Sequence, residues 1–104
     1  MWLRIFGMGI GLCCSMLAHA DDAMLQLAQE NACMTCHAIN HTVIGPSFKA
    51  VAARYRKTPN AADYLAQRLQ HGSVGDWGQV PMPPNVQASP EDLRRLAQWV
   101  LGQA

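Results

Sequence analysis

Two cysteines and a histidine stand close together in the first half of the chain, where residues 33–37 read Cys-Met-Thr-Cys-His. Two thiols three positions apart can each add to one vinyl group of a haem and form a thioether. The histidine that directly follows the second cysteine then lies under the ring, where its imidazole can bind the iron. The motif therefore predicts one covalently attached haem c, held by Cys33 and Cys36, with His37 as a ligand to the iron.

Three other uses of this cysteine pair stay open at this point. A disulfide is the plain alternative in an exported protein. A thioredoxin-like redox pair would sit at a strand-to-helix junction, and the sequence shows no α/β pattern around the motif. A zinc site would need further Cys or His ligands at metal spacing, and His41 alone is a poor candidate. The five-residue motif favours haem attachment over each of these uses.

A methionine between prolines is the best candidate for the sixth ligand of the iron. Met82 lies within residues 80–85, which read Val-Pro-Met-Pro-Pro-Asn. The prolines remove backbone freedom and hold the thioether in one place without a helix. An isolated loop methionine more often fills a gap in the core, but after a haem-attachment motif we expect Met82 to bind the iron. Four further side chains have suitable chemistry but no such bracing, namely Met24, Met34, His41 and His71.

Helices must position these residues, because apolar side chains recur at helical spacing along the chain. Four helices are expected: from Asp21 or Asp22 to about Ala32, from Pro46 to Tyr55, from Asn60 to Gly72, and from Ser89 to Leu101. The last has the clearest signals, since Ser89 can cap it, Pro90 suits its first position and Asp92 completes a Ser-x-x-Asp pattern. Gly72 stands where a left-handed residue would end the third helix.

A long loop between Gly72 and Ala88 is dense in Gly and Pro and carries both Trp77 and Met82. No strand pattern competes with the helices, and loops of this length in compact domains tend to be functional. The apolar stripes of the helices would cover too little to form a core by themselves. The expected fold class is therefore all-α, with about four helices wrapped round one haem and a long loop that carries the methionine ligand.

The start of the chain has the features of a cleaved signal peptide. Arg4 supplies a positive charge, residues 5–17 are apolar, and Ala-His-Ala at 18–20 offers the small residues that signal peptidase accepts. The apolar run is too short to span a bilayer comfortably, so we expect no stable membrane insertion. Lipidation at Cys13 or Cys14 is the alternative, but the residues before them fit a lipoprotein cleavage pattern poorly.

One domain is expected after export, because the whole chain has only 104 residues. The expected boundaries are 1–20 for the signal peptide and 21–104 for the mature domain, which we place in the periplasm. Cleavage would remove Arg4, one of eight basic residues, and leave the basic residues equal in number to the seven acidic ones. A neutral domain argues against a nucleic-acid partner, which requires a clustered basic excess.

Taken together, these motifs resemble the short bacterial class I cytochromes c, which are periplasmic electron carriers. The resemblance covers nearly all of the mature chain and rests on residues 33–37, Gly45-Pro46, 68–72, Trp77-Gly78, 81–85 and 96–101. It implies the small cytochrome c fold, thioethers at Cys33 and Cys36, and axial iron ligation by His37 and Met82.

The resemblance also implies roles for residues around the ligands. The Pro46 carbonyl would accept the proton of the His37 ring nitrogen that faces away from the iron. Arg68 and Trp77 would donate hydrogen bonds to a haem propionate, and Asn85 would orient the Met82 side of the pocket. Each of these residues also has an alternative role without the haem: Pro46 could simply start a helix, Trp77 could be a core aromatic, and Arg68 could lie in solvent.

Two departures from the family pattern bear on the haem edge. Asp76 places a carboxylate beside Trp77, near the expected propionates. Relatives often carry lysines around the exposed edge, where this chain has Gln29, Asn31 and Thr42. A basic cluster that could compensate consists of Arg54, Arg56 and Lys57.

A six-coordinate haem leaves no open iron site for a substrate, so the expected function is single-electron transfer and not enzyme catalysis. The resemblance implies a periplasmic reductase, such as nitrite reductase, or a terminal oxidase as electron acceptor. An upstream cytochrome or a quinol-oxidising complex would be the donor, and we expect the protein to be a monomer. The alternatives are a haem enzyme or gas-binding sensor whose Met82 ligand dissociates, and a haem domain detached from a larger oxidase or dehydrogenase.

Overall fold

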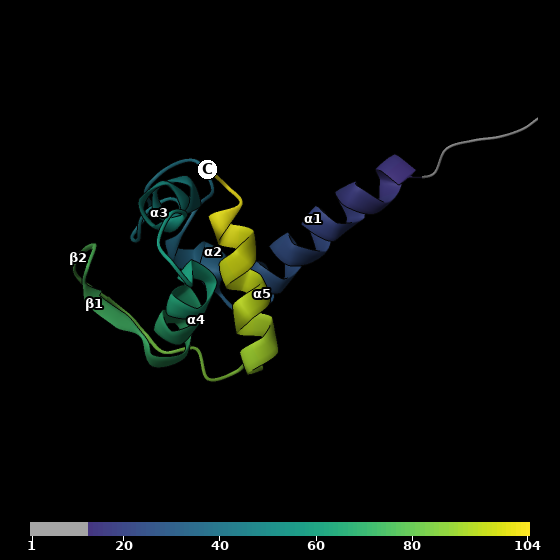
Figure 1. The fold of residues 1–104 in the computed structure, drawn as a ribbon. Coiled ribbons are helices and arrows are strands. Elements are labelled where there is room, and N and C mark those ends of the chain that lie inside the picture. Colours follow the sequence, from purple (N-terminus) through teal and green to yellow (C-terminus); the bar gives the residue numbers. More distant parts are fainter. Residues whose placement is uncertain (1–12) are drawn as a thin grey trace, which may run out of the picture.

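A computed structural model describes residues 13–104 of the chain. The elements are α1 (Cys13–Glu30), α2 (Cys33–Cys36), α3 (Phe48–Tyr55), α4 (Ala61–His71), β1 (Ser73–Gly75), β2 (Gly78–Met82) and α5 (Pro90–Leu101). Helices α2 to α5 gather into one body, with the two strands at its edge (Figure 1). Arg4 and most of the expected signal-peptide run lie outside the described residues. No helix within 13–104 is long and apolar enough to cross a membrane.

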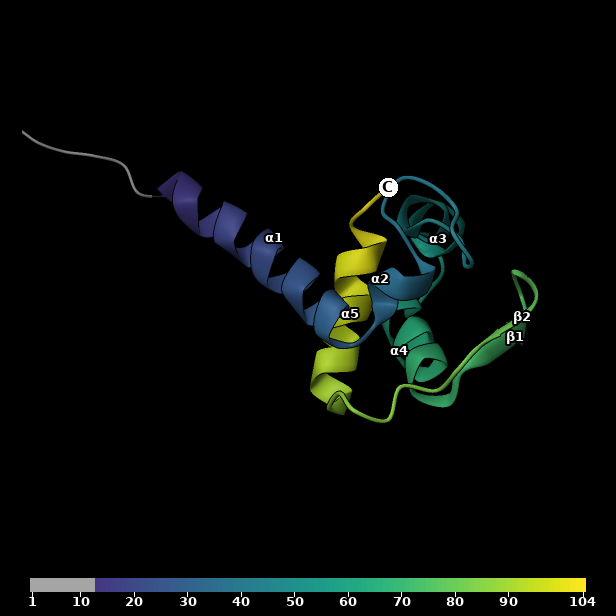
Figure 2. The same cartoon turned by 180° about the vertical axis from the view of Figure 1, so that it is seen from behind.

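The first helix is longer than predicted. It begins by Cys13 and runs through Asp21 and Asp22, so the prediction that one of these aspartates caps it is wrong. The residues before them include Met, Leu and Ala, which propagate a helix well. The N-terminal part of α1 projects away from the other helices (Figures 1 and 2), whereas the fully buried Ala28 packs against α5. A left-handed Ala32, with φ 62°, then turns the chain into α2.

The next three long helices follow the signals in the sequence. The Ser47 hydroxyl accepts a hydrogen bond from the Ala50 N–H at 3.0 Å and starts α3. The Ser89 hydroxyl accepts one from the Asp92 N–H at 3.1 Å and starts α5, which confirms the predicted cap. Gly72 follows the last turn of α4 with φ +84°, a value that glycine adopts without strain. These caps satisfy backbone groups that a helix end leaves unpaired.

The long loop contains a β-hairpin, so the prediction that this stretch has no strand is wrong. Strands β1 and β2 pair antiparallel, with Ser73 opposite Met82 and Gly75 opposite Gly78. The two glycines have φ values of +98° and +118°, and the two residues between them form the tip. The strands have three and five residues and contain glycine and proline, so they carry no alternating apolar pattern.

The core of the described residues is small. Ala28, Leu93 and Leu96 are buried where α1 crosses α5, and Phe48 is buried where α3 meets α5. Phe48 also contacts Trp99 edge to face, with 5.5 Å between ring centroids. Leu96 is the largest side chain that is fully buried in this part of the chain. A core of this size agrees with the expectation that the fold surrounds a further apolar group.

Candidate haem site

His37 is held in one orientation by the loop that follows it. Its ring Nδ1 lies 2.7 Å from the Pro46 carbonyl oxygen. Because a carbonyl can only accept, Nδ1 donates its proton there and Nε2 keeps its lone pair. The N–H groups of Ile44 and Gly45 both donate to the Cys36 carbonyl, at 3.2 and 2.7 Å. The loop is therefore fastened to the end of α2, and it fixes the tautomer expected of an iron ligand.

The His37 ring lies directly against the backbone at Gly45. A Cβ at position 45 would lie 2.5 Å from the ring Cε1, closer than any side chain tolerates. On another side the ring stacks on Phe48, with 5.2 Å between centroids and 25° between planes. Glycine is thus required at position 45 because the His37 ring lies so close to the backbone, and not because the backbone angles there exclude other residues.

Replacing Gly45 with alanine is expected to displace either the ring or the loop backbone, because the added methyl group has no room. We expect the free energy of unfolding of the haem-loaded protein to fall by about 1–3 kcal/mol, as overpacking usually costs. Chemical denaturation measures it. The matched control is Gly102→Ala, where the nearest atom is 3.4 Å from the new Cβ and a change below about 0.5 kcal/mol is expected. Equal stability of the two variants would contradict the close-packing argument.

The two cysteines lie at the ends of the single-turn helix α2, and both are free, half-buried thiols. Burial raises the pKa of the Cys33 thiol above its ordinary value, and a backbone hydrogen bond partly offsets the rise. Before haem is attached, burial thus disfavours the thiolate form of Cys33. Helix α2 brings both sulfurs beside the residue that follows them, His37.

Met82 is the last residue of β2, so the hairpin positions it as well as the prolines. Its strand pairs it with Ser73, at the start of β1. The backbone of Gly72 approaches so closely that a Cβ there would lie 2.7 Å from the Met82 carbonyl oxygen. The Met82 side chain is half-buried. Sequence reasoning found the proline bracing and missed the second strand, which is what ties Met82 to the end of α4.

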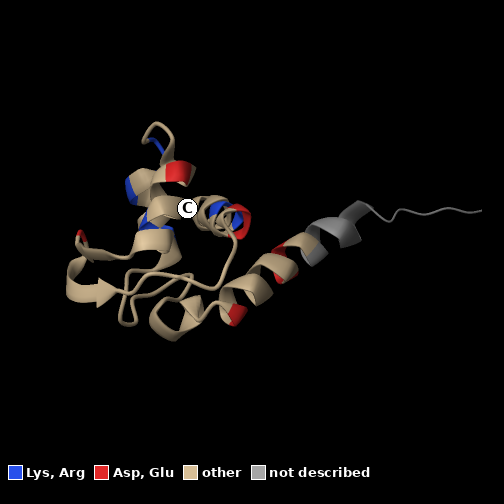
Figure 3. Cartoon of the chain, turned by 90° about the horizontal axis from the view of Figure 1, so that it is seen from below, with Lys and Arg blue, Asp and Glu red and all other residues tan. Residues whose placement is uncertain are grey.

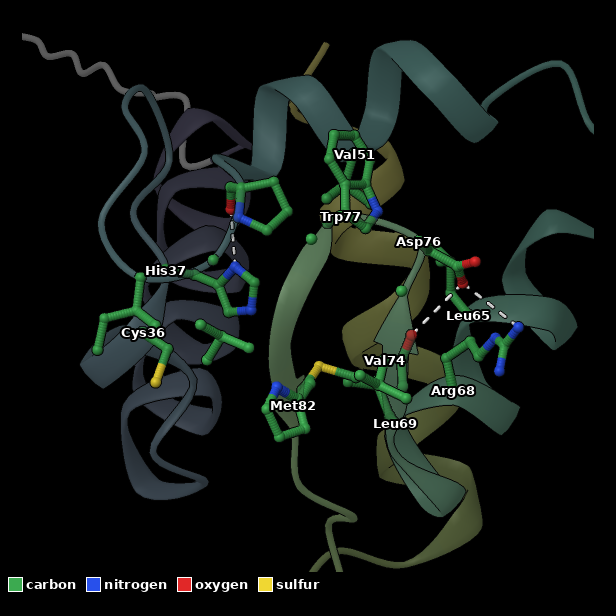
Figure 4. A pocket seen from close by; sticks show the side chains of 18 of the residues that line it. Cys36, His37, Val51, Leu65, Arg68, Leu69, Val74, Asp76, Trp77 and Met82 are labelled. Carbon is green, nitrogen blue, oxygen red and sulfur yellow. Dashed lines mark hydrogen bonds and ion pairs between the residues drawn. The ribbon is translucent and has the colours of Figure 1, made fainter.

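Two adjoining cavities bring the predicted ligands together. The larger has a volume of about 480 Å³ and is lined by Cys36, His37, Pro46, Arg68, Trp77 and Met82, among others. The smaller has about 280 Å³ and is lined by Cys33 and Asn85, together with Cys36, His37 and Met82. All eight predicted site residues therefore line one cavity or the other. Figure 4 shows the His37 ring and the Met82 sulfur meeting the larger cavity from different elements.

The residues present fit a haem. The walls are mostly apolar, and they offer an imidazole with a free Nε2, a thioether and two thiols. This is the donor set of a covalently attached haem with histidine and methionine ligands. No other common cofactor uses these four side chains together.

The two residues expected at a propionate are engaged with protein groups. The Arg68 Nη2 lies 3.3 Å from the Asp76 carboxylate, and its Nε donates to the Tyr64 hydroxyl at 3.3 Å. The guanidinium of Arg54 lies 4.5 Å from the centroid of the Trp77 ring. Sequence reasoning missed Tyr64, although its spacing of four residues from Arg68 places both on one helix face. It placed Arg54 in a basic cluster that could compensate at the haem edge, and no local signal indicates its contact with the hairpin.

These contacts also affect the ionisation of Arg68 and of Tyr55, which lies beside Arg54. Hydrogen bonding to Tyr64, followed by the charge of Asp76, raises the pKa of Arg68 above its ordinary value. Burial raises the pKa of Tyr55, and the nearby Arg54 opposes that rise. Arg68 is therefore a cation and Tyr55 a neutral phenol at any physiological pH.

Asn85 anchors the loop between β2 and α5. Its side-chain oxygen accepts from the N–H groups of Gln87 and Ala88, at 3.0 and 2.9 Å. Its side-chain nitrogen donates to the Asn31 oxygen at 3.2 Å, and its backbone N–H donates to the Leu69 carbonyl. Asn31 is a partner that sequence reasoning missed, because the two asparagines are 54 positions apart.

Comparison with known proteins identifies the family of the chain. The cytochrome c family profile matches residues 25–104. The chain is 43% identical over 100 residues to cytochrome c-552 of Nitrosomonas europaea, covering 96% of this chain and 93% of that protein. It is 45% identical over 80 residues to cytochrome c-551 of Allochromatium vinosum, covering 77% and 85% of the two chains.

Structural comparison gives the same result. The crystal structure of wild-type Nitrosomonas europaea cytochrome c552 aligns with a TM-score of 0.75 at 45% identity, over 77% of this chain and 99% of that one. These findings confirm the helix-dominated fold, to which the small hairpin is added, and the resemblance to small class I cytochromes c. They also confirm the expected cofactor, since the homologues carry one covalently attached haem c. The chain belongs to the cytochrome c family.

Proposed function

We propose that this protein is a periplasmic single-electron carrier whose haem c is attached through Cys33 and Cys36, with His37 and Met82 as axial ligands. The observation that carries the proposal is the shared cavity of His37 and Met82, with the free ring nitrogen of His37 available to a metal. Two protein ligands from different elements would leave no position for a substrate on the iron. Electron transfer is then the function that fits.

The chain's own residues favour rapid one-electron exchange. When bound, the haem supplies a reversible one-electron couple at its iron. The Pro46 carbonyl holds the His37 ring, and the paired strands hold Met82, so neither ligand needs to move when the charge changes. A histidine–methionine ligand pair raises the reduction potential relative to more donating sets. The apolar cavity walls add to this effect, because they disfavour the extra positive charge of the oxidised state.

The proposed mature protein consists of residues 21–104, is formed by cleavage after Ala20 and works as a monomer in the periplasm. Support comes from the family match, which begins at residue 25, just beyond the proposed cleavage site. The part of α1 before that site projects from the helical body (Figure 2). The intact mass and sedimentation of the exported protein test the cleavage site and the oligomeric state.

The experiment that tests the function uses the purified, haem-loaded protein. Its visible spectrum should be that of a low-spin haem c in both oxidation states, and it should exchange electrons with a second cytochrome. Carbon monoxide separates the carrier from the alternative, a haem enzyme or gas sensor with a dissociable Met82. A carrier should leave the reduced spectrum unchanged under carbon monoxide. Rapid conversion to a carbon monoxide complex would favour the alternative instead.

We further propose that the carrier docks on its reductase or oxidase through an apolar patch. Val43, in the loop that follows His37, is 48% exposed and lines neither cavity, so its exposure does not depend on whether a haem fills them. Residues expected near the haem edge, such as Gln29 and Thr42, carry no charge. Exposed apolar surface with no charge beside it favours docking without electrostatic steering. Figure 3 shows the Lys and Arg residues on the helical body, whereas the charged residues of α1 are acidic.

The electron-transfer rate to the natural partner should therefore depend weakly on salt. Electrostatic steering changes association by about tenfold or more and fades as ionic strength rises. The rate should be measured as salt rises from low to physiological concentration, and we expect it to stay within about threefold. The basic cluster Arg54, Arg56 and Lys57 supplies the competing expectation. A tenfold fall would assign docking to that cluster and not to the apolar patch.

A further inference from the structure

The tip of the β-hairpin carries a carboxylate that collects several donors. The Asp76 carboxylate lies 3.3 Å from Arg68 Nη2, 3.5 Å from the Tyr64 hydroxyl and 3.4 Å from the Ser73 hydroxyl. Its side chain is 32% exposed and lines the larger cavity. Figure 4 shows Asp76 and Arg68 facing one another at one side of that cavity. Asp76 is thus a cavity residue whose charge is directed at Arg68.

The backbone of the same residue fastens the tip to α3. The Arg54 Nη1 donates to the Asp76 carbonyl oxygen at 2.8 Å, and its guanidinium then covers the Trp77 ring. Trp77 also meets Tyr55 edge to face, with 6.3 Å between centroids. The hairpin tip is therefore attached to α3 through Arg54 and to α4 through Arg68. Only the second attachment uses the charge of the Asp76 side chain.

The charges at this end of the cavity do not balance once a haem is present. Arg54 and Arg68 supply two positive charges and Asp76 one negative charge. A haem brings two propionates, and Arg68 is a residue expected to bind one of them. An arginine shared with Asp76 neutralises a propionate less than an unshared arginine does. Negative charge near the iron stabilises its oxidised state, because that state carries one more positive charge.

We propose that Asp76 is a positioning residue that holds Arg68 at the hairpin tip and thereby lowers the reduction potential of the haem. The effect runs through Arg68: the carboxylate holds the guanidinium at the hairpin tip, so a propionate bound there is less fully neutralised and more negative charge remains near the iron. The proposal rests on the electron-carrier function proposed above and names the residue pair that sets its driving force.

The test compares the haem-loaded wild type with Asp76→Asn by redox titration. Asparagine keeps the size of the side chain and leaves the backbone bond to Arg54 in place, so only the charge is removed. At a fixed external potential we expect the ratio of reduced to oxidised protein to rise by about threefold or more. For a one-electron couple, a tenfold rise corresponds to about 59 mV. Asp76→Ala is a second neutral replacement for which the same direction is expected.

The matched control is Asp63→Asn, which makes the same change of charge on α4. Asp63 pairs with Arg94 at the surface and lines neither cavity, so the ratio should change by less than about 1.5-fold. A second arm repeats Asp76→Asn in an Arg68→Gln background. Because Asp76 acts through Arg68, the effect of the Asn replacement should shrink to half or less there.

Three results would overturn the proposal: an unchanged or lower ratio in Asp76→Asn, a change no larger than in Asp63→Asn, or a full effect in the Arg68→Gln background. The visible spectrum separates such a failure from failure of the proposed function. An intact iron–methionine band with an unchanged potential removes only the role of Asp76. A wild type that lacks this band, or that binds carbon monoxide readily, removes the carrier function itself.

Discussion

Replacing Met82 with alanine should abolish the weak red-region band that arises from charge transfer between methionine sulfur and oxidised iron. The variant should also bind added imidazole at least about tenfold more tightly than the wild type, a change of about 1.4 kcal/mol. The reason is that alanine leaves one face of the iron without a protein ligand, whereas the wild type must first release Met82. Absorption spectra of the oxidised protein and an imidazole titration measure the two effects.

Met34→Ala is the matched control, since it removes a thioether that packs against the core and lines neither cavity. It should lose some stability and keep the band. A band that survives in Met82→Ala would transfer the ligand role to another methionine. A band lost in both variants would point to general loosening of the fold and not to ligation.

Replacing both Cys33 and Cys36 with alanine should remove the covalent link between haem and protein. The wild type should keep its colour on the polypeptide during extraction with acidic acetone and show the added mass of one haem. The double variant should lose all colour to the solvent and have the mass of the bare chain. Its free energy of unfolding should fall by on the order of 3 kcal/mol, because a core this small depends on its bound group.

Thr35→Ala provides the control for this double variant, because Thr35 lies between the two cysteines and is exposed. It should keep both the colour and the added mass. Colour that leaves the wild-type polypeptide would refute covalent attachment. Colour that stays on the double variant would mean that some other side chain carries the link.

Local signals explain how much of the fold could be predicted. The start of α5 was predicted correctly, since Ser89 and Asp92 cap it within four positions and no distant contact is needed. The start of α1 was predicted wrongly, because aspartates that are able to cap a helix are also tolerated inside one when good helix formers precede them. The hairpin was missed since its shape depends on Gly75 and Gly78 and not on an apolar pattern.

The candidate site likewise has parts that the sequence predicts and parts that it does not. The motif at Cys33 to His37 and the proline bracing of Met82 concern neighbours in the chain, and their chemistry follows from residue type alone. The bond from Arg54 to the Asp76 carbonyl spans 22 positions, and that from Asn85 to Asn31 spans 54. Contacts of this kind depend on how the helices pack, which no pattern within one segment indicates.

The partner of the His37 ring is a backbone oxygen, and this has a consequence for how the protein can evolve. A hydrogen bond to a side chain disappears with one substitution, but no substitution at position 46 deletes the main-chain carbonyl. The basicity of the imidazole is thus protected from point mutation as long as the loop keeps its path. The loop in turn depends on Gly45, which cannot gain even one methyl group without meeting the ring. Single substitutions should therefore change the site more readily at the exposed hairpin than on the histidine side.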